Sequence, residues 1–329
     1  MKAEYIKYLV CPKCDSSLAI KEITKGSPTH IESGLIVCQK CSAAYEIINS
    51  IPRFVPKENY ASSFGLEWNI HSKTQYDSYS GINCSEKRFF EETGWPRNLK
   101  GQIILEAGSG SGRFTEQAAS TGALVISADF SNAVEANYKS NGSRENVFIV
   151  QADIYSLPFR KQLFDKLFCI GVIQHTPDPY KAFIALPQYL KNDGKLVIDV
   201  YKKTLSVYLA AKYYVRFFTK NMNADKLYKY TKKYVDFMWP IANIIRRIPK
   251  IGPKINWALC MADYSRLGLK DNMLKEWTYL DTFDMLSPRY DYPQTLKTVK
   301  KWFQDAVLSD IDIHYGYNGI EARGTKKIG

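Results

Sequence analysis

A glycine-rich turn between a short apolar strand and a helix constrains the fold of this chain more than any other feature. The segment Ile103 to Ala107 is apolar apart from Glu106, and glycines follow it at positions 108, 110 and 112. Glycine lets a backbone turn sharply and approach a ligand closely, because it has no Cβ. Such a turn is typical of parallel sheets that bind nucleotide-like ligands.

The turn departs from the dinucleotide-binding fingerprint G-x-G-x-x-G. Its spacing is G-x-G-x-G, and Arg113 occupies the position of the third fingerprint glycine. Glu106 stands two residues before the first glycine, where its carboxylate would repel a pyrophosphate. S-adenosylmethionine has no phosphate and carries an ammonium and a sulfonium. The turn therefore favours S-adenosylmethionine over NAD.

Apolar segments alternate with helical ones and predict a doubly wound parallel sheet. The expected strands cover residues 103–107, 124–128, 147–150, 166–172, 195–201, 311–315 and 319–323. Ligands bind such sheets beyond the carboxyl ends of the strands. Asp129 ends the second strand, about 20 residues past the turn, where a carboxylate can accept both hydroxyls of a ribose.

Four segments in this order resemble motifs one to four of class I S-adenosylmethionine-dependent methyltransferases, in the small-molecule branch that includes quinone-biosynthesis enzymes. They are Glu106-Ala-Gly108-Ser-Gly110, Asp129, Asp153-Ile154 and Gly171 to His175. The resemblance implies a Rossmann-like α/β sheet of seven strands whose last strand is antiparallel. It further implies that Glu106, Gly108 and Gly110 hold the methionine part of the cofactor, Asp129 the ribose, and Asp153 and Ile154 the adenine.

Candidate catalytic and substrate-binding residues lie in two places. His175 follows the fourth strand, where it can act as a general base or substrate ligand; alternatively it is a hydrogen-bonded wall residue. A polar segment near residue 290 offers Tyr290 as a candidate catalytic residue and Arg289 and Asp291 as candidate substrate ligands. The alternative for that segment is a structural bracket between an insertion and the sheet.

Four cysteines near the N-terminus form two CxxC pairs, Cys11/Cys14 and Cys38/Cys41, separated by 23 residues. Two such knuckles supply the four thiolates of a tetrahedral zinc site. Residues 5–56 resemble the zinc ribbons typified by the small activator subunit of tRNA methyltransferases, with Glu46 and Ser50 in place of a proline and a glycine. The resemblance implies a structural zinc ion and a ribbon able to dock a protein partner.

The seven cysteines and the apolar runs bear on the cellular compartment. An odd cysteine count without a signal peptide favours a reducing compartment, so the expected location is cytoplasmic. The sequence contains no run of about 18 apolar residues, so no membrane-spanning helix is expected.

Positive charge is concentrated in one segment. Residues 202–254 hold thirteen Lys or Arg and two Asp, a local net charge of +11, which leaves about +1 of the total +12 for the rest of the chain. Ten aromatic residues are interleaved with these cations. This composition suits a helical lid over an anionic or lipid-linked substrate, or peripheral binding to an anionic membrane surface. The alternative is a solvated helical hairpin whose aromatic residues pack on the core.

These patterns divide the chain into five parts. They are a zinc ribbon (1–57), a helical cofactor-covering segment (58–100), the S-adenosylmethionine-binding core (101–201), the basic helical insertion (202–282) and the C-terminal part of the sheet (283–329). In the covering segment, Trp68 and Phe89 either contact the ligand or staple the segment onto the core.

The expected function is methyl transfer to a small-molecule, glycan-precursor or lipid-linked acceptor. An RNA methyltransferase stays open as an alternative, because another zinc-ribbon family methylates ribosomal RNA and the basic segment could bind phosphates. A non-enzymatic cofactor-binding scaffold is a third alternative.

Overall fold

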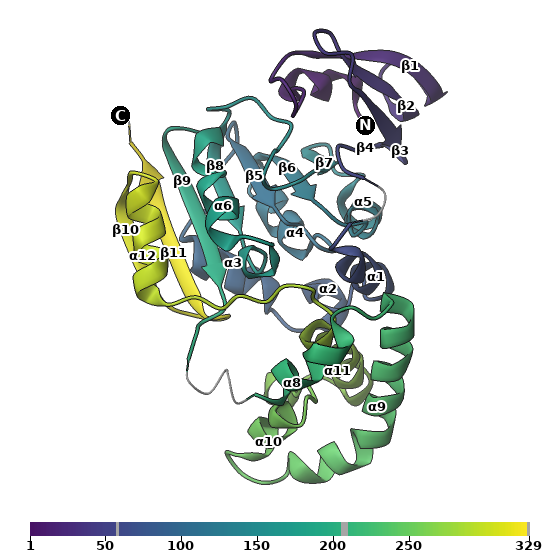
Figure 1. The fold of residues 1–329 in the computed structure, drawn as a ribbon, viewed down its shortest axis with the longest axis vertical. Helices are drawn as coiled ribbons and strands as arrows, with labels where there is room; N and C mark the ends of the chain where they lie inside the picture. Colours follow the sequence, from purple (N-terminus) through teal and green to yellow (C-terminus); the bar gives the residue numbers. More distant parts are fainter. Residues whose placement is uncertain (57–58, 205–209, 328–329) are drawn as a thin grey trace.

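The central sheet has seven strands in the order β10-β11-β9-β8-β5-β6-β7 (Figure 1). The computed structural model describes residues 1–56, 59–204 and 210–327. The strands are β5 (Ile103–Ala107), β6 (Leu124–Asp129), β7 (Val147–Gln151), β8 (Phe164–Cys169), β9 (Leu190–Val200), β10 (Leu308–Tyr315) and β11 (Ile320–Lys326). Strands β5 to β9 run parallel, and β11 is antiparallel to β9 and β10. The predicted sheet with its antiparallel last strand is confirmed.

Successive residues of the central strands point to opposite faces and so belong to two separate cores. Ile104 and Val125 pack on one face, together with helices α3, α4 and α5, whereas Leu105 and Ile126 pack on the other, against α6 and α12. These helices are α3 (Ser85–Thr93), α4 (Arg113–Ser120), α5 (Val134–Asn141), α6 (Pro179–Ile184) and α12 (Leu296–Asp305). Because both faces of these strands are buried, their sequences are nearly continuous apolar runs.

Several strand boundaries differ from the prediction. Strand β10 begins at Leu308 rather than at residue 311, and β11 ends at Lys326 rather than at residue 323. Strand β8 ends at Cys169 rather than at residue 172, because Gly171 takes a φ of +77° and starts a turn. Strand β9 begins at Leu190 rather than at residue 195. The polar residues after Leu190 form a bulge within the strand, where Asp193 has a φ of +60°. In the sequence, these polar residues have the composition of a turn.

The N-terminal part is a separate four-stranded antiparallel sheet in the order β1-β2-β3-β4. Its elements are η1 (Ala3–Tyr8), β1 (Leu18–Gly26), β2 (Ile31–Cys38), β3 (Ala44–Ile48) and β4 (Ile51–Pro52). Asn49 and Ser50 join β3 to β4 with φ angles of +53° and +65°, so Ser50 adopts the left-handed conformation that glycine favours. The expected boundary between residues 57 and 58 lies outside the described residues.

This small sheet packs against β7, the edge strand of the large sheet (Figure 1). The ring of Tyr5 lies 4.8 Å from that of Phe148, and the Phe54 amide donates to the carbonyl of Gln151 over 2.8 Å. Side chains from both sheets form one continuous hydrophobic core. The ribbon is therefore fused to the edge of the seven-stranded sheet.

The segment between β9 and β10 is helical, as predicted. It contains α8 (Ala211–Thr219), α9 (Ala224–Ile245), α10 (Gly252–Ala258) and α11 (Asp271–Leu286), which precede α12. These helices lie with α1 (Ser62–Ile70) and α2 (Asp77–Ser80) beyond one end of the parallel strands (Figure 1). The short 3-10 helices are η2 (Ile173–His175), η3 (Pro187–Tyr189) and η4 (Ser265–Leu267). Within the described ranges, no helix has the length and apolar character needed to cross a bilayer.

Candidate functional site

A cavity of about 950 Å³ lies between the carboxyl ends of the parallel strands and the inserted helices. Each parallel strand contributes residues at or just after its carboxyl end to the wall: Gly108, Asp129, Ala152, Gly171 and Tyr201. Helices α8, α10 and α11 supply the opposite wall. The cavity thus occupies the position where sheets of this topology bind their ligands.

The glycine turn packs closely against the side chains of Val172 and Trp68, so residues with a Cβ are disfavoured at Gly108 and Gly110. Gly108 has a φ of +89°, and a Cβ at this residue would lie 2.3 Å from a methyl carbon of Val172. A Cβ at Gly110 would lie 3.1 Å from the indole nitrogen of Trp68. Trp68 therefore lines the cavity against the turn, whereas Phe89 is fully buried in the core.

Glu106 lies buried beneath the turn. One carboxylate oxygen accepts hydrogen bonds from the hydroxyls of Thr115 and Ser127, the latter over 2.7 Å. Its other oxygen, Oε1, has no hydrogen-bond partner among the described residues. Burial raises the pKa of Glu106 to about 7, although the two hydroxyls favour the ionised form. Glu106 is therefore a buried carboxylate with one unsatisfied oxygen beneath the turn, although it is not among the residues that line the cavity.

Asp129 links the second strand to the turn. Its Oδ2 accepts from the amide of Gly110 over 2.9 Å, and its Oδ1 accepts from the amide and hydroxyl of Ser131. Burial raises the pKa of Asp129, and these hydrogen bonds oppose the rise. Asp129 and Ile154 line the cavity, whereas Asp153 is not among the lining residues and accepts from the amide of Tyr155.

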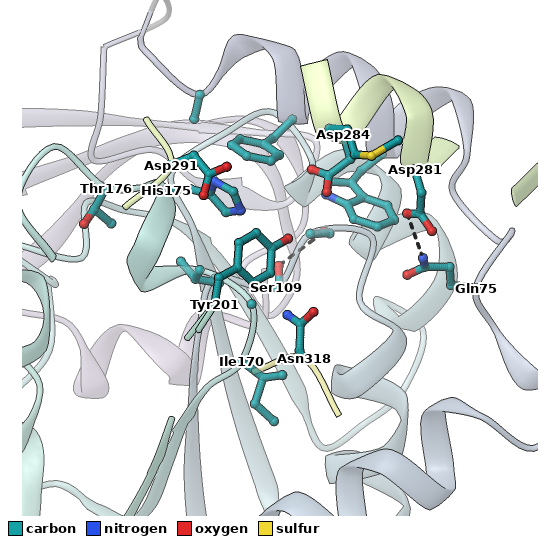
Figure 2. A pocket seen from close by; sticks show the side chains of 18 of the residues that line it. Gln75, Ser109, Ile170, His175, Thr176, Tyr201, Asp281, Asp284, Asp291 and Asn318 are labelled. Atoms are coloured by element: carbon teal, nitrogen blue, oxygen red, sulfur yellow. Dashed lines mark hydrogen bonds between the residues drawn. The ribbon is translucent and has the colours of Figure 1, made fainter. Parts of the chain in front are cut away.

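His175 lies in the cavity wall, with its ring between those of Phe64 and Tyr201, each 5.2 Å away (Figure 2). Its Nδ1 is 3.0 Å from the carbonyl oxygen of Tyr290. A carbonyl can only accept, so this contact assigns the hydrogen to Nδ1. In the neutral ring Nε2 is then left with a free lone pair. The arrangement suits proton abstraction from a ligand in the cavity.

The segment around residue 290 mainly connects the inserted helices to the sheet. Asp291 lines the cavity but is paired with Lys212 at 3.1 Å and Arg216 at 2.5 Å. Tyr290 packs edge-on against the ring of Tyr60, and its carbonyl holds His175. Arg289 is exposed and lines a separate small hollow. Of the three candidate residues, Asp291 is the one that lines the cavity.

Two carboxylates that the sequence reasoning missed point into the cavity from α11. Asp281 and Asp284 line its wall, and Gln75 donates to Asp281 over 3.4 Å (Figure 2). Burial raises the pKa of each to about 6. Their signal in the sequence is a spacing of three residues, which places both on one face of a helix, and each directly follows a buried residue, Leu280 or Phe283.

The four N-terminal cysteines come together as predicted. All four Sγ atoms lie within 4.8 Å of one another, with Cys11 and Cys41 3.6 Å apart and Cys14 and Cys38 3.4 Å apart. Zinc–sulfur bonds of about 2.3 Å in a tetrahedron require sulfurs roughly 3.8 Å apart. The cluster therefore fits a structural zinc ion.

The chain is similar to known methyltransferases over part of its length. Residues 105–198 match the methyltransferase domain family. A ubiquinone biosynthesis O-methyltransferase of Coxiella burnetii is 29% identical over 113 residues, which cover 34% of this chain and 48% of the relative. A phosphoethanolamine N-methyltransferase of Caenorhabditis elegans is 32% identical over 151 residues, covering 40% of this chain and 34% of the relative.

The chain thus spans about half the length of the first of these relatives and a third of the second. A crystal structure from Methanococcus maripaludis, described as an S-adenosyl-L-methionine-dependent methyltransferase, has a TM-score of 0.46 to this chain at 16% identity. That comparison covers 83% of this chain and 97% of the other.

Proposed function

We propose that this chain, whose residues 105–198 form a class I methyltransferase domain, transfers the methyl group of S-adenosylmethionine to a small-molecule acceptor enclosed by the inserted helices. The observation that carries the proposal is the cavity. It extends from the glycine turn to α11, and its volume of about 950 Å³ is at the upper end for ligand sites. It therefore has room for a cofactor and a small acceptor together.

The residues on the sheet side would hold the cofactor. Glu106, Gly108 and Gly110 would face its methionine part, Asp129 its ribose, and Asp153 and Ile154 its adenine. Two observations support this assignment: the unsatisfied Oε1 of Glu106, and the position of Gly108, Gly110, Asp129 and Ile154 in the wall of the cavity. When bound, S-adenosylmethionine supplies an electrophilic methyl group.

Replacing Asp129 with alanine should weaken S-adenosylmethionine binding more than tenfold. The substitution removes a charge-assisted pair of hydrogen bonds, a loss on the order of 2 to 3 kcal/mol. Calorimetry of wild type and variant measures the difference. Asp165→Ala is the matched control, because Asp165 accepts from the Ile103 amide and Lys191 and is not among the residues that line the cavity. Equal affinity in Asp129→Ala would refute the ribose assignment.

The pKa of about 7 at Glu106 predicts that cofactor binding depends on pH. A cationic ligand favours the ionised carboxylate, so binding below pH 7 should release a proton. Affinity should rise by about tenfold between pH 6 and 8 if the ionised form alone binds. Calorimetry in two buffers of different ionisation enthalpy measures the released proton. Glu106→Gln should remove this part of the pH dependence, and an unchanged profile in that variant would contradict the prediction.

On the acceptor side, His175 would remove a proton from an attacking hydroxyl or amine. Its Nδ1 donates a hydrogen bond to the Tyr290 carbonyl, which leaves Nε2 as the proton acceptor. The rings of Phe64 and Tyr201 pack against the imidazole and limit its orientation. Asp281 and Asp284 would contact polar or cationic groups of the acceptor.

A screen of acceptors with labelled cofactor tests this function. It would include phenols and catechols as oxygen nucleophiles, phosphoethanolamine and other amines as nitrogen nucleophiles, and transfer RNA and ribosomal RNA. Transfer to a small molecule supports the proposal. Transfer to RNA alone would replace it with the RNA methyltransferase alternative. NAD binding in place of S-adenosylmethionine would overturn the class.

A further inference from the structure

The outer surface of the inserted helices carries an unusual number of apolar side chains. Among the described residues, twelve of the 22 exposed large hydrophobic side chains lie between Tyr214 and Leu259. Five of these are more than 60% exposed: Tyr214, Phe217, Phe218, Phe237 and Ile244. Single exposed apolar residues are normal on a soluble protein, but a concentration in one segment marks a binding surface.

Helix α9 shows that this exposure is patterned. Its buried residues Leu227, Thr231, Val235 and Ala242 form one stripe toward the protein. Tyr230, Phe237, Ile241 and Ile244 recur at intervals of seven, four and three residues, so they form a second stripe, which is exposed. At 100° per residue the two stripes are about 110° apart. The second stripe is thus a separate apolar face that no part of the described chain covers.

Cations lie next to the exposed stripe. Lys226, Lys229, Lys233 and Arg247 are exposed and, within the described chain, have no acidic partner within ion-pair distance. On the helical wheel the three lysines lie on the solvent side of the stripe, opposite the buried face, and Arg247 follows the end of the helix. By contrast, Lys212, Arg216 and Arg246 point inward and pair with aspartates. The outer surface therefore combines apolar side chains with uncompensated positive charge.

We propose that this surface, Tyr230, Phe237, Ile241 and Ile244 with the four flanking cations, binds an anionic lipid bilayer. Aromatic rings at headgroup depth, isoleucines at the acyl boundary and cations on anionic headgroups match the composition of interfacial helices. Each cation near such a surface contributes about 1 kcal/mol. RNA would leave the isoleucines without favourable contacts, because they cannot stack on bases. A second copy of the same surface would bring like charges together.

The cavity reaches this part of the molecule. Lys254, Trp257 and Ala258 of α10 are exposed, and they also line the cavity. Helix α10 packs directly against α9. A bilayer bound at α9 would therefore lie near one wall of the cavity, and a lipid or lipid-linked acceptor could enter from it. The entry of an acceptor from the bilayer rests on the proposed function, whereas bilayer binding itself does not.

Sedimentation of the full chain with vesicles tests the proposal. The vesicles contain phosphatidylcholine alone or phosphatidylcholine mixed with phosphatidylserine, at low salt. We expect binding to the mixed vesicles. Replacing Phe237 and Ile244 together with serine should weaken it at least tenfold. Lys229→Glu combined with Lys233→Glu should weaken it as well. Val307→Ser is the matched control, because Val307 is 75% exposed but lies between α12 and β10.

Several results would overturn the proposal. They are no binding of the wild type, binding unaffected by the Phe237 and Ile244 replacements, tighter binding to RNA that the same replacements abolish, or a concentration-dependent dimer that they disrupt. Calorimetry with S-adenosylmethionine on the same variants separates this test from the proposed function. Loss of cofactor binding in all proteins would refute that function and leave bilayer binding intact.

Discussion

Replacing His175 with alanine is expected to lower kcat for methyl transfer by about 10² to 10⁴-fold, the usual contribution of a positioned general base. The affinity for S-adenosylmethionine should stay unchanged, because the imidazole lies on the acceptor side of the cavity. Single-turnover kinetics with an acceptor from the screen, combined with calorimetry of cofactor binding, separates the two effects. Partial recovery of the rate by added imidazole would show that the lost group acts chemically.

Tyr290→Phe is the matched control for His175→Ala. It removes a hydroxyl and keeps the backbone carbonyl that binds His175 Nδ1. Tyr290 is not among the residues that line the cavity, so kcat should change little. A large loss in Tyr290→Phe with a small one in His175→Ala would reverse the two roles. Similar small losses in both would mean that the acceptor needs no base from either residue.

Replacing Cys38 with serine is expected to remove zinc and unfold the ribbon. Zinc binding in small cysteine sites contributes roughly 10 to 16 kcal/mol near neutral pH, far more than a four-stranded sheet of this size gains from packing. Elemental analysis should give one zinc per chain in the wild type and close to none in the variant. Amide hydrogen exchange should accelerate across residues 18–48.

Cys84→Ser provides the control, because Cys84 is partly buried but lies outside the four-cysteine cluster. Its zinc content and exchange should equal those of the wild type. A wild-type protein purified without added metal that contains no zinc, while its ribbon is still protected from exchange, would refute the structural role of the ion.

The elements that sequence reasoning predicted are those with a local signal. Strands β5 to β7 end within one residue of their predicted ends, because each is a mainly apolar run bounded by glycine or polar residues. The cysteine cluster follows from spacing alone. The bulge in β9 could not be predicted, because its residues have the composition of a turn and the pairing of the sheet overrides that preference.

The walls of the cavity were harder to predict because distant segments form them. Trp68 meets the glycine turn from a helix 40 residues earlier, and Asp281 and Asp284 arrive from a helix 170 residues later. No local sequence pattern indicates which face of α11 lies toward the sheet. Arg216 shows the same limit: the basic segment that contains it was expected to face a substrate, a membrane or solvent, yet Arg216 is buried against Asp291.

The covered edge of β7 has a consequence for assembly. An open sheet edge is a template for pairing with another chain, and proteins generally blunt or cover it. Here the covering unit is part of the same polypeptide, joined through the hydrogen bond from Phe54 to Gln151 and the ring contact of Tyr5 with Phe148. Because the ribbon and the sheet are joined in one chain, the effective concentration of the ribbon at this edge does not depend on the expression level. The stoichiometry of ribbon to seven-stranded sheet is therefore fixed at one to one, and dilution cannot separate them.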